Sequence, residues 1–392
     1  RDPSSVVTDW APAFAGATEV SFPRKRESSG FAKITGSPLS RGRRGGCRRP
    51  GEGRDPSSVV TDWAPAFAGA TEVSFPRKRE SSLMRALVTG ATGFVGRVLV
   101  AELLRRGHSV RAAVRGSDSG FPDLVEVGDL SPSTDWRAAL RDVDTVFHLA
   151  ARVHVRGDAH DDWERVNVAA TAALARAALD AGARRFVFAS SVKVMGETSG
   201  DRPFVENDFP NPQDAYGRSK LAAEQALARL GGGLDVTIVR PPLVYGPGVR
   251  ANFLSLLRLA DSRWPLPLAG ATARRSLVYV GNLADALIAC ATVPHPTPAT
   301  YLVSDGDDVS VAELVTRLRA ALGVRAPLWP LPAGLAKALA AAVGRRDAAR
   351  RLFEPLRVDA GRIRRELGWS PPFEQREGIA ATVEWFRARG RR

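Results

Sequence analysis

A tyrosine and a lysine four positions apart are the residues of this 392-residue chain best suited to chemistry. Tyr216 and Lys220 would lie on one face of a helix, because residues four apart are neighbours on a helix surface. A phenol titrates near pH ~10 and is a poor base at neutrality, but a nearby ammonium stabilises the phenolate. The pair therefore predicts a proton shuttle, and Ser190 or Ser191 adds a hydroxyl that could donate to the same substrate oxygen.

A proton shuttle interconverts an alcohol and a ketone only beside a hydride carrier, which no side chain supplies. Gly90, Gly93 and Gly96 offer a place for one. They follow the apolar run 86–88 and precede apolar residues at helical spacing, which predicts strand, tight turn and helix. Such a turn leaves room for a pyrophosphate at the helix N-terminus, where the macrodipole favours negative charge. Because the spacing is Gly-x-x-Gly-x-x-Gly, an ordinary glycine-rich turn stays open as the alternative.

Short apolar runs alternate with helical patterns along the rest of the chain. This alternation predicts an α/β fold with a parallel sheet wrapped by helices on both faces. An amphipathic piece with Trp136 and Leu140, capped at Ser133 or Thr134, is predicted between two of the strands. The expected strands are 109–114, 124–127, 145–149, 185–189 and 235–239, with a long alanine-rich helix at 161–181.

Arg115 ends the second predicted strand. In dinucleotide folds an acidic residue there holds the ribose 2′-hydroxyl of NAD, whereas an arginine accommodates a 2′-phosphate. The residue therefore favours NADP(H) over NAD(H), with a solvated surface arginine as the alternative. His148 lies in an apolar strand end and is expected to pack rather than to catalyse. His154 and His160 show no metal-ligand spacing, so no metal is predicted.

Composition predicts a globular protein, with 44% hydrophobic and 25% charged residues. The net charge is +14, but no compact Lys/Arg run with interleaved aromatics occurs beyond residue 83, so no nucleic-acid partner is expected. No apolar run reaches membrane-spanning length, and we expect no membrane partner. The two cysteines, Cys47 and Cys290, lie in unrelated parts, which predicts a reducing, cytoplasmic location without disulfides.

Residues 1–29 and 54–82 are identical, and a Gly/Arg-rich spacer separates them. Two copies without a helical or strand period do not make a solenoid, which needs about three repeats. The string resembles translated interspersed DNA repeats, and no methionine precedes Met84. We expect the native protein to begin at Met84, with 1–83 a non-native or disordered duplication. A transit peptide or an arginine-rich arm is the alternative.

As a set, the motifs resemble the extended short-chain dehydrogenase/reductase family, in its NAD-dependent epimerase/dehydratase group that acts on nucleotide sugars. The resemblance implies a Rossmann doubly wound parallel sheet with a smaller α+β C-terminal substrate domain. It covers residues 84–387. The matching segments are 89–96, 129–130, 148–151, Asn167, Ser191, the Tyr216/Lys220 pair and 240–247.

The resemblance also implies residue roles. Ser191, Tyr216 and Lys220 would be the catalytic trio, with Ser191 preferred because residues 191–196 match the family's Ser-x-x-x-x-Gly. Asn252 and Arg275 would bind substrate, Arg275 by clamping its diphosphate, since a guanidinium fork matches phosphate oxygens. The implied cofactor-binding residues are Gly90, Thr92, Gly93, Phe94, Val95, Gly96, Arg115, Asp129 (on adenine), Leu130, Leu149, Ala150, Ala151, Tyr216, Lys220 and Pro242.

The domain boundaries predicted from the resemblance are 84–240 for the NAD(P)-binding domain, with 276–292 returning to it, and 241–275 plus 293–392 for the substrate-binding domain. The most similar branch contains reductases of UDP-4-keto-6-deoxy-N-acetylhexosamines in bacterial polysaccharide synthesis. This branch implies hydride transfer to C4, Tyr216 as proton donor, a UDP-sugar substrate and a homodimer.

Two positions depart from the family pattern. Leu243 stands where UDP-galactose 4-epimerases present an asparagine, and Asn282 stands where the family usually has aspartate. A UDP-glucose or UDP-N-acetylglucosamine 4-epimerase with retained NAD is the alternative. A non-catalytic NAD(P)-binding regulator is the alternative from another class.

Overall fold

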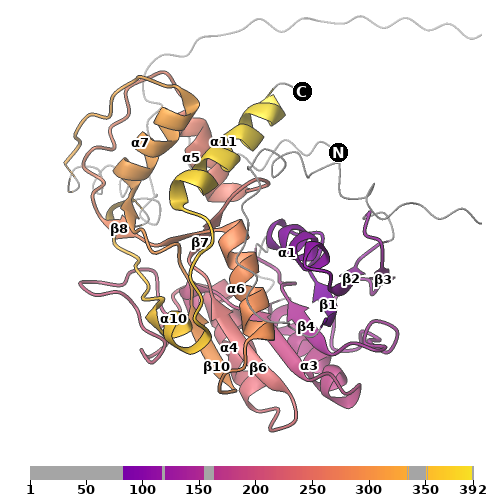
Figure 1. Cartoon of the computed structure of the whole chain (residues 1–392). Helices are drawn as coiled ribbons and strands as arrows, with labels where there is room; N and C mark the ends of the chain where they lie inside the picture. Colours follow the sequence, from indigo (N-terminus) through magenta and orange to yellow (C-terminus); the bar gives the residue numbers. More distant parts are fainter. Residues whose placement is uncertain are drawn as a thin grey trace, which may run out of the picture.

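The computed structural model describes residues 83–116, 120–153, 163–332, 334, 350 and 352–390. The duplicated segment at 1–82, His154, His160 and the first two residues of the predicted helix 161–181 lie outside this part. Figure 1 shows a sheet with flanking helices at one end and a group of helices, α5, α7 and α11, at the other.

A seven-stranded sheet forms the larger part, with strand order β10-β6-β5-β4-β1-β2-β3. Every neighbouring pair is parallel, which confirms the predicted doubly wound Rossmann sheet. The strands are β1 (Arg85–Thr89), β2 (Ser109–Val114), β3 (Leu124–Glu126), β4 (Thr145–His148), β5 (Arg185–Ala189), β6 (Asp235–Arg240) and β10 (Ala299–Leu302). The predicted domain boundaries placed residues 299–302 in the substrate part, whereas the structure adds them to this sheet.

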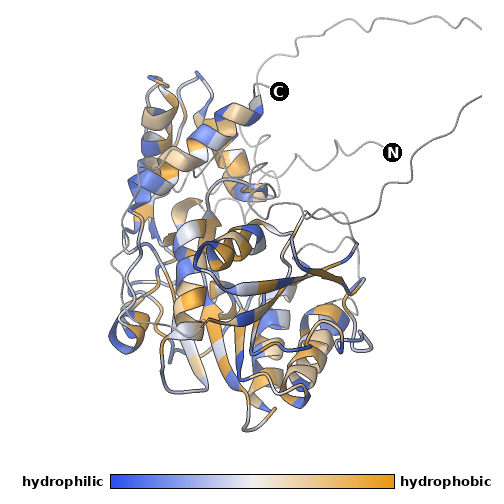
Figure 2. Cartoon of the chain, turned by 45° about the vertical axis from the view of Figure 1, so that its right-hand side comes forward, coloured by the Kyte–Doolittle hydropathy of each residue, from blue (hydrophilic) through white to orange (hydrophobic). Residues whose placement is uncertain are grey.

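Helices cover both faces of the sheet. Successive residues of a strand point to opposite faces, so Ala86 and Val88 pack in one core and Leu87 packs in the other. The first core lies under α1 (Phe94–Arg105) and α6 (Val280–Thr292), and the second under α3 (Ala170–Asp180) and α4 (Ala215–Ala228). Hydrophobic colouring of the central strands in Figure 2 matches strands that are buried on both faces.

Two local predictions differ from the structure. The piece containing Trp136 and Leu140 consists of turns, although both side chains are buried as the amphipathic spacing indicated. The predicted helix at 161–181 begins with a π-helical segment, η4 (Glu164–Ala169), before α3 continues it. Hydrophobic spacing indicates which residues face the core, but it does not distinguish these backbone forms.

The smaller part is built on α5 (Ala251–Ala260), α7 (Val311–Leu322), α10 (Gly361–Leu367) and α11 (Gln375–Gly390). The predicted capping box is present, since Ser310 and Glu313 exchange hydrogen bonds at the start of α7. Two small sheets join the parts. One pairs β7 (Leu243–Tyr245) with β9 (Leu277–Tyr279), and the other pairs β8 (Arg274–Arg275) with β11 (Val309–Ser310).

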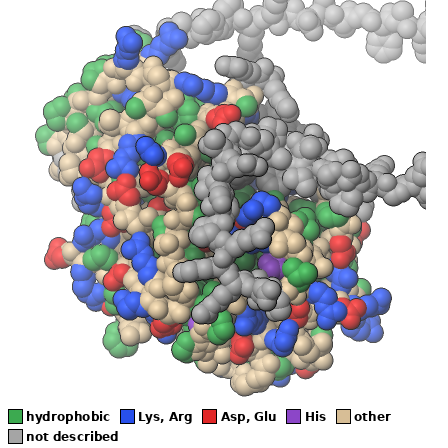
Figure 3. Space-filling model, in the orientation of Figure 1, with side chains coloured by type: hydrophobic (Ala, Val, Ile, Leu, Met, Phe, Trp, Pro, Cys, Tyr) green, Lys and Arg blue, Asp and Glu red, His purple; other side chains and the backbone are tan. Residues whose placement is uncertain are grey.

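Charges of both signs lie intermingled on the described surface visible in Figure 3. Among the described helices, none has the length and apolarity to cross a membrane. The described cysteine, Cys290, is buried and free.

A buried ion pair fastens α4 to β6. Arg240 donates to both carboxylate oxygens of Glu224, at 3.0 and 2.5 Å, and the two side chains are only 7% and 5% exposed. Ser190 also donates to Glu224, and Arg240 contacts the Met195 sulfur at 2.8 Å. The carboxylate depends on these partners because water does not reach it.

We expect Arg240→Met to lower the free energy of unfolding by about 3–5 kcal/mol, since it leaves a buried carboxylate without its cation. Adding Glu224→Gln should recover part of this loss, because an amide still accepts from Ser190. Denaturant unfolding measures both effects. Arg137→Met, which breaks an exposed pair with Asp135, is the control and should leave stability unchanged. An equal loss in the single and double variants would contradict the charge argument.

Candidate active site

Helix α4 carries the tyrosine and lysine on one face. Asp214 caps the helix, and its Oδ1 accepts from the Gly217 amide at 2.7 Å. Tyr216 lies in the first turn and Lys220 one turn later, with the Lys220 Nζ 6.0 Å from the centre of the Tyr216 ring. The structure therefore brings the two residues together as their spacing predicted.

Lys220 is held at the carboxyl end of β5. Its side chain is buried, and its Nζ donates to the Ala189 carbonyl at 2.8 Å and lies 4.4 Å from the centre of the Phe188 ring. Burial lowers the pKa of Lys220 to about 7, against the opposing charge of Glu224. The ammonium is fixed in position, and it titrates in the neutral range.

The pKa of Tyr216 differs from the expectation. Burial, and then the negative charge of Asp214, raise the pKa of the phenol above its ordinary value, whereas the sequence analysis expected Lys220 to lower it. The expectation was wrong for the protein groups alone because removing the phenolate from water outweighs a cation at this distance. The phenol of Tyr216 is therefore neutral near pH 7, and added positive charge would favour its ionisation.

The two serines after β5 have different partners. Ser190 is buried and its hydroxyl donates to Glu224, so its hydrogen is already used. Ser191 is half-buried, and its oxygen accepts from the Lys193 amide at 3.2 Å, which leaves its hydroxyl hydrogen for another acceptor. This difference supports the sequence-based preference for Ser191.

The glycine turn has the form that a dinucleotide needs. Gly90 has φ +70°, and a Cβ there would lie 2.8 Å from the Ala150 nitrogen. A Cβ on Gly96 would lie 2.1 Å from the Gly90 oxygen, so the helix packs on the turn only without a side chain. The turn follows β1 at the edge of the sheet where β1 and β4 are neighbours. The strand order reverses there, and such sheets bind ligands at this point.

The start of α1 fits the phosphates. Gly93 is the N-cap and provides no side-chain cap, and the first turn holds no acidic residue. Thr92 and Gly93 are exposed, so the helix amides face the surface. These features together fit a pyrophosphate at the helix N-terminus.

The remaining cofactor candidates line the same strand ends. Arg115 and Asp129 follow β2 and β3, and they form an ion pair at 3.8 Å with side chains 80% and 73% exposed. Pro242 is buried beyond β6. The half-buried candidates are Phe94, Val95, Leu130, Leu149, Ala150 and Ala151.

Other predicted residues have structural partners. His148 is buried between Thr89 and Thr171, at 2.7 and 2.8 Å, and burial together with the charge of Lys220 lowers its pKa to about 3. It is therefore neutral, in agreement with the predicted packing role. Asn282 is also buried, and it bonds to Asp305 and Phe373. No group of possible metal ligands occurs within the described ranges.

The predicted substrate residues lie in the smaller part. Asn252 is half-buried on α5, and Arg275 on β8 donates to the Glu354 carbonyl at 2.8 Å. The stretch after Glu354 also bonds to the loop that follows Ser191, through Ser199 N to Pro355 O at 2.9 Å. Arg275 is thus joined through this stretch to the loop beside the catalytic candidates.

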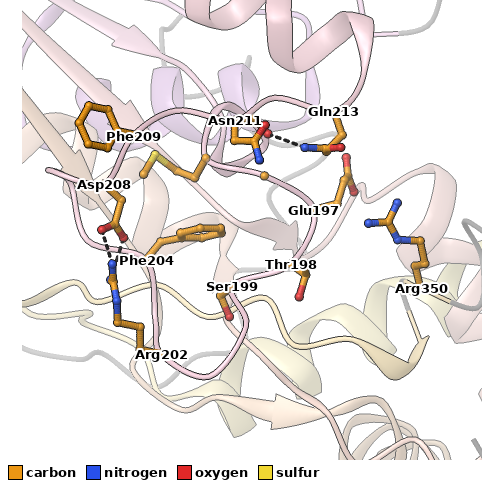
Figure 4. Close-up of a pocket in the computed structure, with 12 residues that line it drawn as sticks. Glu197, Thr198, Ser199, Arg202, Phe204, Asp208, Phe209, Asn211, Gln213 and Arg350 are labelled. Carbon is orange, nitrogen blue, oxygen red and sulfur yellow. Dashed lines mark hydrogen bonds and ion pairs between the residues drawn. The ribbon is translucent and has the colours of Figure 1, made fainter.

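A hollow of about 550 Å³ lies along the chain between two of the catalytic candidates, although Ser191, Tyr216 and Lys220 do not themselves line it. It is formed by the loop between Ser191 and Tyr216, and Arg350 reaches it from the far end of the chain (Figure 4). Sequence reasoning missed it because, apart from Met195 and Gly196, the lining residues belong to no motif. They are Met195, Gly196, Glu197, Thr198, Ser199, Arg202, Phe204, Asp208, Phe209, Asn211, Gln213 and Arg350.

The lining of the hollow combines carboxylates, guanidinium groups, amides and hydroxyls with two phenylalanine rings. In Figure 4, Arg202 and Asp208 pair with each other, while Glu197 and Arg350 lie on the other side. Such a mixture offers donors and acceptors for hydroxyl groups and flat apolar surface for a ring. A polyhydroxylated ligand fits these properties.

Comparison with known proteins agrees with this geometry. The model of the NAD dependent epimerase/dehydratase family matches residues 86–303. A UDP-glucose 4-epimerase of Vibrio cholerae is 42% identical over 314 residues, covering 76% of this chain and 94% of that protein. One from Mycolicibacterium smegmatis is 32% identical over 338 residues, covering 78% and 99%. The structure of MoeE5 with UDP-glucuronic acid and NAD is 32% identical, with a TM-score of 0.63 and coverage of 78% and 99%.

We expect Thr92→Asp to weaken dinucleotide binding by about tenfold, because a carboxylate beside the α1 N-terminus repels a pyrophosphate and competes for the same amides. The asparagine of Thr92→Asn has nearly the same shape as the aspartate but no charge. This variant should bind the dinucleotide within about twofold of the parent, since the helix dipole favours only the charged group. Titration of protein fluorescence with NAD and NADP measures both. Equal affinities for the two variants would contradict a phosphate site at this turn.

Proposed function

This chain belongs to the NAD dependent epimerase/dehydratase family, and we propose that it inverts C4 of a UDP-linked hexose with one retained NAD. The observation that carries the proposal is the convergence of Ser191, Tyr216 and Lys220 at the carboxyl end of β5, where the Lys220–Ala189 hydrogen bond fixes α4. The 42% identity with a protein named UDP-glucose 4-epimerase supports the same reaction.

The three side chains divide the proton chemistry. Tyr216 takes the proton of the C4 hydroxyl and later returns it to the C4 oxygen, while Ser191 donates a hydrogen bond to that oxygen. Lys220 supplies positive charge that favours the phenolate. A nicotinamide held at the glycine turn would supply the hydride chemistry at C4, and positive charge on its ring would favour ionisation of Tyr216.

Inversion requires the hydride to return to the other face of C4, so the sugar must turn in the site between the two transfers. We propose that the sugar extends toward the hollow lined by Glu197, Asn211 and Arg350, whose mixed donors and acceptors suit several orientations of one sugar. Arg275 is the proposed diphosphate ligand, since phosphate anchorage would hold the substrate while its sugar turns.

A UDP-4-keto-sugar 4-reductase is the second candidate, because Arg115 and Leu243 favour it. Arg115 is 80% exposed after β2, where a guanidinium accommodates the 2′-phosphate of NADP. Leu243, on β7 and 39% exposed, provides no amide for the substrate. In this reaction Tyr216 gives its proton to the C4 oxygen, and one reduced cofactor is consumed per turnover.

Cofactor consumption separates the two reactions. We expect purified protein to interconvert UDP-glucose and UDP-galactose, or their N-acetyl forms, without net change in reduced nicotinamide. Chromatography of the sugar nucleotides and absorbance of reduced nicotinamide measure the two quantities. Stoichiometric NADPH oxidation with a UDP-4-keto sugar would establish the reductase instead. Folded, dinucleotide-binding protein that does neither would contradict both.

We expect Tyr216→Phe to lower kcat by about 10²- to 10⁴-fold, because it removes the hydroxyl that carries the C4 proton in the proposed reaction. The affinity for NAD should stay nearly unchanged, since the ring is kept. Steady-state kinetics and NAD titration measure the two effects. Tyr301→Phe removes a hydroxyl bonded to Glu366 on another part of the sheet, and it is the control with unchanged kcat. Full activity in Tyr216→Phe would favour a non-catalytic dinucleotide-binding regulator.

A further inference from the structure

Lys193 lies close to the catalytic candidates but has no role in the proposed reaction. It belongs to the 3₁₀ turn η5 (Val192–Val194), two residues after Ser191. Its ammonium forms a short ion pair with Asp214 and a second one with Glu197 at 3.0 Å. The Lys193 side chain is 31% exposed, so the pair itself contributes little stability. The ion pair with Asp214 nevertheless joins two segments, η5 and the start of α4.

Asp214 uses its two oxygens for different partners. Oδ1 accepts from the Gly217 amide at 2.7 Å and so holds the first turn of α4, which contains Tyr216. Oδ2 accepts from Lys193, which belongs to the turn of Ser191. One carboxylate therefore links the segment of the tyrosine to the segment of the serine.

The two segments are also in close backbone contact. A Cβ on Gly217 would lie 2.7 Å from the Lys193 carbonyl oxygen, so a side chain there would force them apart. The Ser191 oxygen accepts from the Lys193 amide, which fixes the serine to the same turn. A shift of Lys193 would consequently move Ser191 relative to Tyr216.

We propose that Lys193 is a positioning residue that, through Asp214, fixes Ser191 against Tyr216 and balances the carboxylate charge beside the phenol. The catalytic part of this inference rests on the proposed function. The geometric part, a clasp between η5 and the start of α4, stands on the contacts alone.

Electrostatics give the clasp a second effect. Burial alone would raise the pKa of Asp214, but the hydrogen bonds from Lys193 and Gly217 hold it below its usual range. Asp214 is therefore ionised at neutral pH, and after burial its charge is the next cause that raises the pKa of Tyr216. Lys193 carries the opposite charge and is paired with this carboxylate. The other charged groups lie on α4 and on the elements packed against it. They are Arg218, Lys220 and Glu224 on α4, Glu197 after η5, Glu164 and Arg165 on η4, Arg176 and Asp180 on α3, and Asp235 and Arg240 on β6.

Substitution of Asp214 and substitution of Lys193 should therefore shift the pH dependence of activity in opposite directions. Asp214→Asn keeps a cap oxygen and removes the negative charge, so the pKa of Tyr216 falls. Lys193→Met leaves the carboxylate unbalanced, so that pKa rises. Where Tyr216 acts as base, activity increases as pH rises through its pKa. The rising limb should move about half a unit down in Asp214→Asn and about half a unit up in Lys193→Met.

The experiment compares Lys193→Met, Lys193→Arg and Asp214→Asn with the parent, and Arg137→Met is a control that breaks an exposed pair elsewhere. The pH dependence of kcat and kcat/KM is measured with the UDP-sugar that turns over. We expect opposite shifts, a roughly tenfold lower kcat in Lys193→Met with little change in NAD affinity, and recovery in Lys193→Arg. Shifts of the same sign in both variants, or no shift, would overturn the electrostatic role.

Amide exchange separates the clasp from the proposed function. Exchange of the Gly217 amide should quicken in Lys193→Met and return to the parent rate in Lys193→Arg. If no UDP-sugar turns over, the proposed function fails, while this measurement still decides the clasp. An unchanged exchange rate of the Gly217 amide in Lys193→Met would overturn the clasp.

Discussion

The candidate site depends on one hydrogen bond between a buried ammonium and a strand-end carbonyl. Lys220 Nζ donates to Ala189 O at 2.8 Å, and this contact joins α4 to the end of β5. Burying an ammonium is unfavourable, as its lowered pKa records, and the carbonyl and the Phe188 ring offset part of that cost. Since Tyr216 lies one turn earlier and Ser191 two residues after Ala189, the same contact determines where both hydroxyls lie.

The surrounding core makes this contact rigid. Ala223 and Leu227 fix one face of α4 against the sheet, and the Glu224–Arg240 pair fastens the same helix to β6. The strands of a parallel sheet all end at one edge, so the hydroxyl, the phenol and the ammonium lie at the same edge as the glycine turn. The fold therefore places the catalytic candidates at one edge of the sheet. The smaller part contributes polar residues to the loop between Ser191 and Tyr216.

Local patterns in the sequence predicted most of the sheet and the Tyr216/Lys220 pair, but they missed β10 at its edge. The strands at β1, β2 and β5 follow from apolar runs, and the Tyr216/Lys220 face follows from helical spacing, because both periodicities are properties of neighbouring residues. The hollow was not predictable, since Arg350 and Glu197 are far apart in the sequence and line the same hollow only through the tertiary fold. The raised pKa of Tyr216 was missed for a related reason: its largest cause is burial, which depends on the packing of the whole site.

Burial acts on Tyr216 and Lys220 in the same direction, because it disfavours the charge on each. The protein groups alone thus favour a neutral phenol at Tyr216, and the amine of Lys220 is only partly protonated near pH 7. After burial, the next cause differs for the two groups: the charge of Asp214 raises the pKa of Tyr216, and the charge of Glu224 opposes the lowered pKa of Lys220. Positive charge brought to the pair favours the phenolate and releases its proton. A bound oxidised nicotinamide would supply such charge, so in the proposed reaction Tyr216 would act as base beside the oxidised cofactor and as acid beside the reduced one.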